Sequence, residues 1–209
     1  MQLRSDSFHP YARLDGRLAF GEYDPGTHVR LSRNRNPHLA WTNVPRETQS
    51  FALTCCDPDV PSEGSRVNRE GMTVPIDLRR TDFFHWVVCD LPPELRSIKE
   101  GAHSDGITTH GKRPGKTPSG GLQGINDYTN WFASDPKMAG EYGGYDGPCP
   151  PWNDERVHGY RFTLYALDVP TLGLSGSFTG QQLREAIQGH VLEQAELLGI
   201  YAIYPNARL

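Results

Sequence analysis

The sequence predicts a mainly β protein, a β-sandwich with one late helix and long loops. Several short runs are apolar or alternate in polarity, and each is bounded by Gly, Pro, Asn or Asp. The 22 glycines and 17 prolines among 209 residues disfavour a helix bundle. Only one helical pattern is present, near the C-terminus, and strand and helix patterns do not alternate as in βαβ units. This length fits a single domain over residues 1–209.

Charge and composition narrow the possible partners. The net charge is -4 and no basic stripe is present, which disfavours nucleic acid. No run approaches the roughly 18 apolar residues of a spanning helix, and the N-terminus lacks a signal-like apolar run, so we expect a cytoplasmic protein that does not span a membrane. The cysteines show no CxxC spacing, which predicts free, mostly buried thiols, with a disulfide or a metal cluster as the lesser alternative. They are Cys55, Cys56, Cys89 and Cys149. We expect no cofactor.

The first half of the chain contains one strong strand and weaker ones. Residues 29–31 are β-prone, and residues 36–41 form a turn that leads into a short extended piece. Residues 49–57 are apolar and β-prone, and Asp-Pro-Asp-Val-Pro at 57–61 is expected to stop that strand. Asp57 has the parity of the apolar residues of its strand, which places a carboxylate on the buried face.

The middle of the chain alternates one buried strand with two irregular segments. Residues 62–82 have mixed charge and no period, which is typical of a surface insertion. Residues 83–90 form a continuous apolar run, as in a strand covered on both faces, with His85 near its beginning. Residues 100–157 are rich in Gly, Asn, Pro and Tyr, and an ordered segment of that length is typical of a binding loop.

The last third predicts a strand and a helix. Residues 158–167 alternate, so His158 and Tyr160 share a face with apolar side chains and lie at the rim of the core. The Pro-Cys-Pro-Pro loop at 148–151 enters this strand and is stiff. Thr179 opens a capping box, and apolar residues at helical spacing predict a helix that continues to Gly199.

Three distant polar residues are expected to meet. Asp57 ends its strand, whereas His85 and His158 begin theirs, so antiparallel pairing would bring all three to one end of the sheet. The loop from Gly147 to Trp152 would then form one wall of a cavity. With Asp57 bound to one ring nitrogen, an imidazole would present its other nitrogen outward as a charged donor, and Tyr160 would add a neutral donor. This set suits a phosphate or carboxylate group.

Each of these residues also has a purely structural interpretation. Either histidine can be a hydrogen-bonded core residue, and Asp57 can cap the turn at Pro58. Tyr160 can simply fill the edge of the core. We favour a role in the pocket over a structural role for the two histidines and for Asp57. For Asp59 the two interpretations are evenly balanced.

Several motifs, in order, resemble the phosphatidylethanolamine-binding protein family, also called Raf kinase inhibitor-like proteins. The motifs are Asp-Pro-Asp-Val-Pro at 57–61, Phe-His-Trp-Val-Val at 84–88, Gly-Pro-Cys-Pro-Pro at 147–151, His-Gly-Tyr at 158–160 and Tyr-Ala-Leu-Asp at 165–168. The resemblance spans about residues 36–201. In its Pro-Cys-Pro-Pro loop the sequence is similar to the bacterial branch of the family, whose members lack the eukaryotic C-terminal helix that gates the pocket. It implies a two-sheet sandwich with Greek-key features, and a homodimer is plausible.

The resemblance also implies a set of ligand-binding residues in a conserved anion pocket. Carried over position by position, they are Asp57, Asp59, His85, Gly147, Pro148, His158 and Tyr160. The insertion and the long loop depart from the family pattern and leave the width of the pocket mouth open.

We therefore expect a non-enzymatic module that holds a small phosphate- or carboxylate-bearing ligand, with a regulatory or inhibitory role and an unidentified protein partner as an open possibility. The alternative is a metal- or His/Asp-dependent enzyme acting on a similar small substrate. No serine or cysteine nucleophile stands at motif spacing beside these residues, which disfavours the enzyme.

Overall fold

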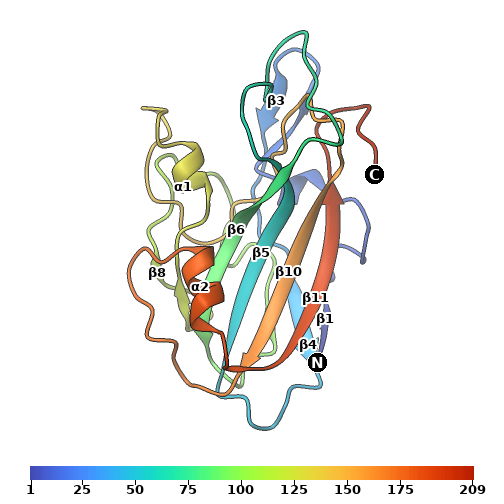
Figure 1. Cartoon of the computed structure of the whole chain (residues 1–209). Helices are drawn as coiled ribbons and strands as arrows, with labels where there is room; N and C mark the ends of the chain where they lie inside the picture. The colour runs from blue at the N-terminus through green and yellow to red at the C-terminus, as the bar shows by residue number, and fades with distance from the viewer.

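A computed structural model describes residues 1–209 and places a long six-stranded sheet at the centre of the molecule. Its strand order is β11-β10-β5-β6-β9-β8, and every neighbouring pair is antiparallel. The four long strands run side by side in Figure 1. They are β5 (Ser50–Pro61), β6 (Arg80–Leu91), β10 (His158–Leu167) and β11 (Val191–Tyr201), and the short ones are β8 (Gly115–Lys116) and β9 (Leu122–Gln123).

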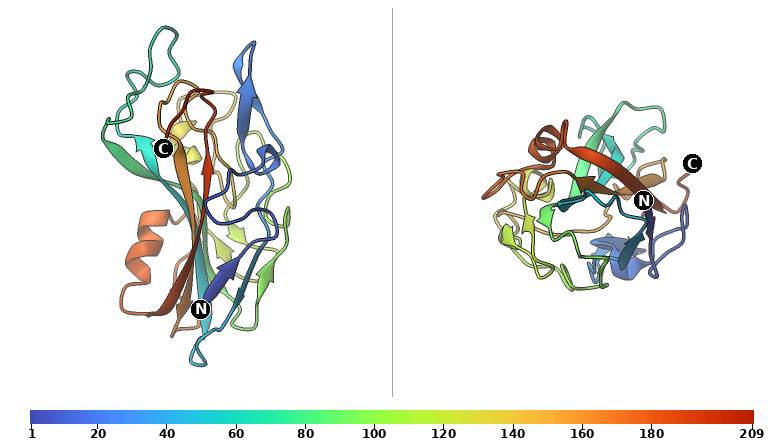
Figure 2. Two further views of the ribbon diagram at one scale, coloured as in Figure 1. Left: turned by 90° about the vertical axis from the view of Figure 1, so that its right-hand side faces the viewer. Right: turned by 90° about the horizontal axis from the view of Figure 1, so that it is seen from below.

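A smaller sheet and a helix cover the two faces of this sheet. The three-stranded sheet has the order β1-β4-β7, and Figure 2 shows it on the face opposite the helix α2 (Gly180–Ala186). Its strands are β1 (Gln2–Arg4), β4 (Leu39–Thr42) and β7 (Ser97–Ile98). The predicted sandwich is thus confirmed in its two main layers. A separate hairpin of β2 (Gly21–Asp24) and β3 (His28–Leu31) rises above the sheet, with a 3-10 turn at Gly16–Leu18 before it.

The core lies on both faces of the central sheet because its strands are apolar on both sides. Between the two sheets, Trp41 and Ile98 pack with residues such as Phe51 and Trp86, all at most 1% exposed. On the other face, Leu183 of α2 packs with Val87 and other apolar residues. The four cysteines are free thiols, three of them buried, as predicted. Neither helix has the length and apolar character that a membrane-spanning helix needs.

The strands agree with the sequence prediction, and their ends differ. Strand β10 covers residues 158–167 as expected, and β3 and β4 contain the two weak candidates. Strand β5 does not stop at Asp57 but continues to Pro61, because Val60 and Pro61 still pair with β6 after a shift in register. Pairing with β10 has already ended at Cys56, so Pro58 lies at an irregular edge. Proline is tolerated at such irregular edge positions, where no amide is needed.

The prediction of one helix over 179–199 is wrong beyond its first two turns. The capping box on Thr179 is present, but α2 ends at Ala186 and residues 191–201 form strand β11. Gly189 adopts φ +81, a left-handed conformation that helices do not continue through. After it, Ala195, Leu197 and Tyr201 share one buried face, which is the period of a strand.

The long segment at 100–157 is mostly irregular, as expected, but it contributes β8, β9 and a second short helix. That helix, α1 (Tyr128–Trp131), stands beside the upper end of β6. The insertion at 62–82 is a loop up to Arg80, where β6 already begins. The loop at 62–79 and the helix α1 lie at the end of the sheet where His85 and His158 are found.

Candidate functional site

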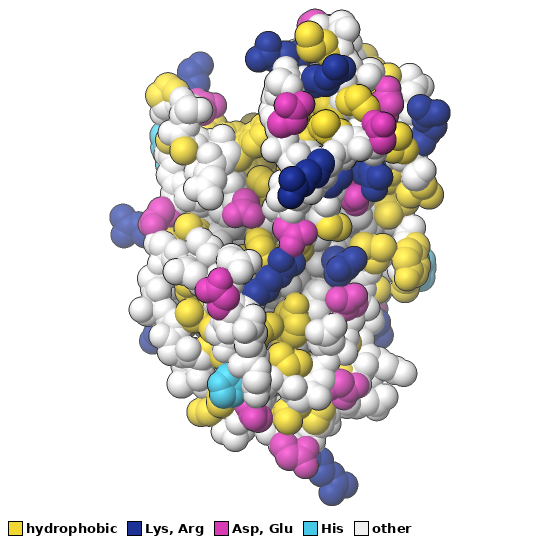
Figure 3. Space-filling view, viewed as in Figure 1, with side chains coloured by type: hydrophobic (Ala, Val, Ile, Leu, Met, Phe, Trp, Pro, Cys, Tyr) yellow, Lys and Arg dark blue, Asp and Glu magenta, His cyan; other side chains and the backbone are white.

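A cavity of about 300 Å³ opens at this end of the sheet, and the predicted polar residues meet in it. Its lining includes Asp57, His85, His158 and Tyr160, which come from β5, β6 and β10. In Figure 3 the surface is hollowed between the α1 side and the side of the 62–79 loop, with hydrophobic side chains inside. The antiparallel pairing assumed from the sequence is confirmed and explains why residues so far apart in the chain converge.

His158 lies at the centre of a buried chain of charges. Its Nδ1 lies 2.7 Å from Oδ2 of Asp57, and its Nε2 lies 3.1 Å from Oδ2 of Asp154. Arg80 in turn donates two hydrogen bonds to the Asp154 carboxylate, at 2.6 and 3.0 Å. The side chains of His158, Asp57 and Asp154 are at most 1% exposed. Two acids and two bases therefore neutralise one another inside the protein.

The charge state of His158 follows from this environment. Burial alone would lower its pKa, but the two carboxylates outweigh burial and raise the pKa of His158 to about 9. Burial alone would raise the pKa of Asp57, but the positive charge of His158 more than offsets burial, so the pKa of Asp57 is lowered. His158 is thus an imidazolium at neutral pH, as expected. The expectation that its second nitrogen faces outward is wrong, because Asp154 accepts from it.

His85 is the histidine that keeps a nitrogen for a ligand. Its Nδ1 donates to the backbone carbonyl of Asp146 at 2.8 Å, and the amide of Asp146 donates back to the carbonyl of His85 at 3.0 Å. A carbonyl only accepts, so Nδ1 carries the proton of the neutral ring and Nε2 is free. Burial lowers the pKa of His85, against the opposing effect of Asp57, so the ring is neutral at pH 7.

Tyr160 completes the polar side of the cavity. It is fully buried, and its ring lies against His85 with centroids 5.1 Å apart. Its hydroxyl lies close enough to the Asp57 carboxylate to be affected by it, but it makes no hydrogen bond of normal geometry within the protein. Burial, reinforced by the negative charge of Asp57, raises the pKa of Tyr160 well above its ordinary value, so the group is a neutral donor. An unpaired buried hydroxyl is costly, and a ligand atom here would relieve that cost.

The other three predicted residues do not line the cavity. The carboxylate of Asp59 accepts from the Gly159 amide at 2.9 Å and from Arg156 at 3.0 Å. A Cβ at Gly147 would lie 2.0 Å from the backbone oxygen of Leu18, and the carbonyl of Pro148 accepts from two backbone amides. These residues hold the loop and the strand ends in place around the site.

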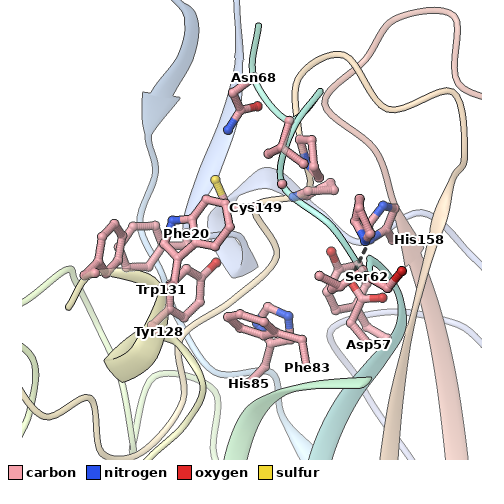
Figure 4. A pocket seen from close by; sticks show the side chains of 18 of the residues that line it. Phe20, Asp57, Ser62, Asn68, Phe83, His85, Tyr128, Trp131, Cys149 and His158 are labelled. Carbon is pink, nitrogen blue, oxygen red and sulfur yellow. Dashed lines mark hydrogen bonds and ion pairs between the residues drawn. The ribbon is translucent and has the colours of Figure 1, made fainter. Parts of the chain in front are cut away.

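The loop after Pro148 does form a wall, as the sequence suggested, through Cys149, Pro150 and Pro151. Sequence reasoning missed the aromatic side of the cavity. Figure 4 shows its residues Phe20, Tyr128 and Trp131 across the cavity from Asp57 and His158. Sequence reasoning also missed Asp154 and Asp146. The Asp146 carboxylate is buried and accepts from three side chains, namely Asn34, Lys112 and Asn126 at 2.6 to 2.8 Å. No group of three or more His, Cys, Asp or Glu side chains is placed to hold a metal ion.

Comparison with known proteins gives a consistent result over nearly the whole chain. The family model described as phosphatidylethanolamine-binding protein matches residues 4–202. A UPF0098 protein of Methanothermobacter thermautotrophicus is 32% identical over 96% of this chain and 98% of its own length. YbhB of Escherichia coli is 28% identical, covering 81% of this chain and 82% of YbhB.

Solved structures agree with the fold. The crystal structure of Escherichia coli YbcL, described as a member of the mammalian PEBP family, superposes with a TM-score of 0.68 at 25% identity and covers 96% of this chain and 97% of YbcL. The structure of CT736 from Chlamydia trachomatis gives a TM-score of 0.64 at 28% identity, with 96% and 95% covered.

Proposed function

This chain belongs to the phosphatidylethanolamine-binding protein family, and on that basis we propose that it binds a small phosphate- or carboxylate-bearing ligand and releases it unchanged. The observation that carries the proposal is the pair of unused polar groups in the cavity. The free Nε2 of His85 and the unpaired hydroxyl of Tyr160 belong to rings in edge contact. An anion placed between them would accept a hydrogen bond from the hydroxyl, and one from Nε2 once the ring of His85 takes up a second proton.

The charges around the site are compatible with an anion. Asp57 lines the cavity, but one of its oxygens accepts from His158 and the other from the amide of Asp59 at 2.8 Å. Its charge is therefore balanced within the protein. His85 would take up a proton as the anion binds, because the charged ring then has a charge-assisted partner.

The test is a variant that removes Nε2 of His85 and keeps the hydrogen bond that the ring donates to the carbonyl of Asp146. In His85→Asn the amide nitrogen takes the place of Nδ1 and can still donate to the Asp146 carbonyl. A hydrogen bond to a charged group contributes about 1.5–3 kcal/mol, so affinity for inorganic phosphate should fall about 10- to 100-fold. Isothermal titration calorimetry measures this, with His190→Asn as the control, since that histidine is exposed and outside the cavity. Equal affinity in the His85 variant and the wild type would contradict the proposal.

The proton uptake by His85 gives a second expected result. The pKa of the free ring is below its ordinary 6.5, and a bound anion raises it, so binding strengthens as pH falls. Affinity for benzoate, whose charge is constant in this range, should increase from pH 8 to pH 6 by up to about tenfold per unit. Calorimetry at fixed ionic strength measures the slope, and His85→Asn should lose it. A wild-type affinity independent of pH would show that His85 is not the group that takes up the proton.

The release of the ligand unchanged has its own check. Phosphoethanolamine incubated with the protein should give a constant phosphorus NMR spectrum. Formation of inorganic phosphate, absent with His85→Asn, would instead support the enzymatic alternative.

A further inference from the structure

One side of the cavity is aromatic and has no part in the proposed anion site. Figure 4 shows Phe20, Tyr128 and Trp131 facing the polar residues Asp57 and His158 across the cavity. The aromatic residues that line the cavity here are Phe20, Phe83, Tyr128, Trp131 and Phe132, and Leu31 lines it as well. This side derives from the hairpin, the start of β6 and the helix α1, which are distant in sequence.

The inner part of this side is a preformed wall. The rings of Phe20 and Tyr128 stack with centroids 4.6 Å apart, and those of Tyr128 and Phe132 stack at 5.5 Å. The hydroxyl of Tyr128 donates to the carbonyl of Gly147 at 2.8 Å, which fixes the ring. A ring held on several sides loses little freedom when a ligand packs against it.

The outer part of the same side is exposed and apolar. Trp131 is 50% exposed and Leu31 is 61% exposed, and both line the cavity. The loop after β5 also contributes Val67 to the lining, and the end of β5 contributes Val60 and Pro61. Apolar surfaces that line an open cavity gain free energy when an apolar group fills it.

The volume supports a ligand larger than the anion alone. An apolar cavity of about 150 Å³ is enough to bind benzene. The cavity here measures about 300 Å³, which holds a ring and also a phosphate or carboxylate group. Aromatic walls favour a flat partner, because rings pair in stacked or edge-to-face arrangements.

We infer that the ligand is an aryl phosphate or aryl carboxylate, whose ring lies against the aromatic side while its anion meets His85 and Tyr160. This rests on the proposed anion binding and adds the chemical class of the rest of the ligand. Trp131 and Leu31 are then the residues that select for the ring. Neither side chain makes a hydrogen bond or ion pair to the buried chain of charges, so replacing either should affect only the contact with the ligand's ring.

The experiment compares inorganic phosphate, phenyl phosphate and the neutral benzyl alcohol by calorimetry on the full chain. Phenyl phosphate should bind at least about tenfold more tightly than inorganic phosphate. Trp131→Ala and Leu31→Ala should reduce that ratio and leave the affinity for inorganic phosphate unchanged. Both side chains are exposed, so the variants should fold. The matched control is Tyr11→Ala, since Tyr11 is 73% exposed and does not line the cavity.

The outcomes separate this inference from the proposed function. Equal affinity for the two phosphates, or an unchanged ratio in both variants, overturns the aryl ligand and leaves anion binding intact. Benzyl alcohol that binds as tightly as phenyl phosphate, with a loss in Trp131→Ala, supports the aromatic subsite and counts against the anion site. Binding of neither phosphate overturns both.

Discussion

Replacing His158 by alanine should destabilise the fold by about 3–5 kcal/mol. The imidazolium lies between two buried carboxylates, and its removal leaves Asp57 without a charged partner. Breaking a buried ion pair by deleting one member is strongly destabilising, because the remaining charge has lost both water and partner. Denaturant unfolding at pH 6.5 measures the difference, provided that the slope against denaturant is unchanged.

The chain contains a matched control for this variant. His190 pairs with Asp168 at 3.0 Å, the same chemistry as His158 with Asp57, but its side chain and that of Asp168 are 44% and 45% exposed. Exposed pairs contribute about 0–1 kcal/mol, so His190→Ala should change stability by no more than that. Similar losses in the two variants would show that the buried chain of charges does not stabilise the fold as argued.

The contrast between these histidines also indicates how far the sequence could be interpreted. The strands were predictable because apolar runs and alternation are local signals, and Asp57, His85 and His158 converge once those strands pair in antiparallel fashion. It was not predictable that His158 would be bound on both nitrogens while His85 kept one free. This difference depends on Asp154 and Asp146, which lie in irregular segments whose conformation is set by distant residues such as Arg80 and Asn34.

The wrong helix has a similar cause. Leu183, Ile187, Val191 and Ala195 fit a helical period, whereas from Ala195 onward every second residue fits a strand equally well. The ambiguity is resolved by non-local pairing, because β11 pairs with β10 from Val191 to Tyr201. Tertiary context commonly overrides a short local pattern of this kind.

Stability should depend on pH in a way that identifies His158. Its pKa is raised from 6.5 to about 9 in the folded protein, so its contribution is fully present below pH 6.5 and is lost as pH rises to 9. The shift corresponds to about 3 kcal/mol. The lowered pKa values of Asp57 and Asp154 act only in acid, where stability is lost as pH falls through their folded values. The lowered pKa of His85 likewise removes stability only as pH falls below 6.5.

Between pH 6.5 and 9, these shifts leave His158 as the dominant group. Burial raises the pKa of all four thiols above 9.0, so they remove stability as the unfolded chain ionises, from about pH 8 upward, and add a smaller loss to that of His158. The free energy of unfolding should therefore decline steadily from pH 6.5 to 9, when measured by urea titration at constant ionic strength. His190→Ala should retain this slope, whereas Asp57→Asn should reduce it, since only one of the two carboxylates that hold the proton on His158 remains. A wild-type protein equally stable at pH 6.5 and 9 would mean that His158 is neutral in the folded state, and the buried ion pairs would then have to be replaced by neutral hydrogen bonds.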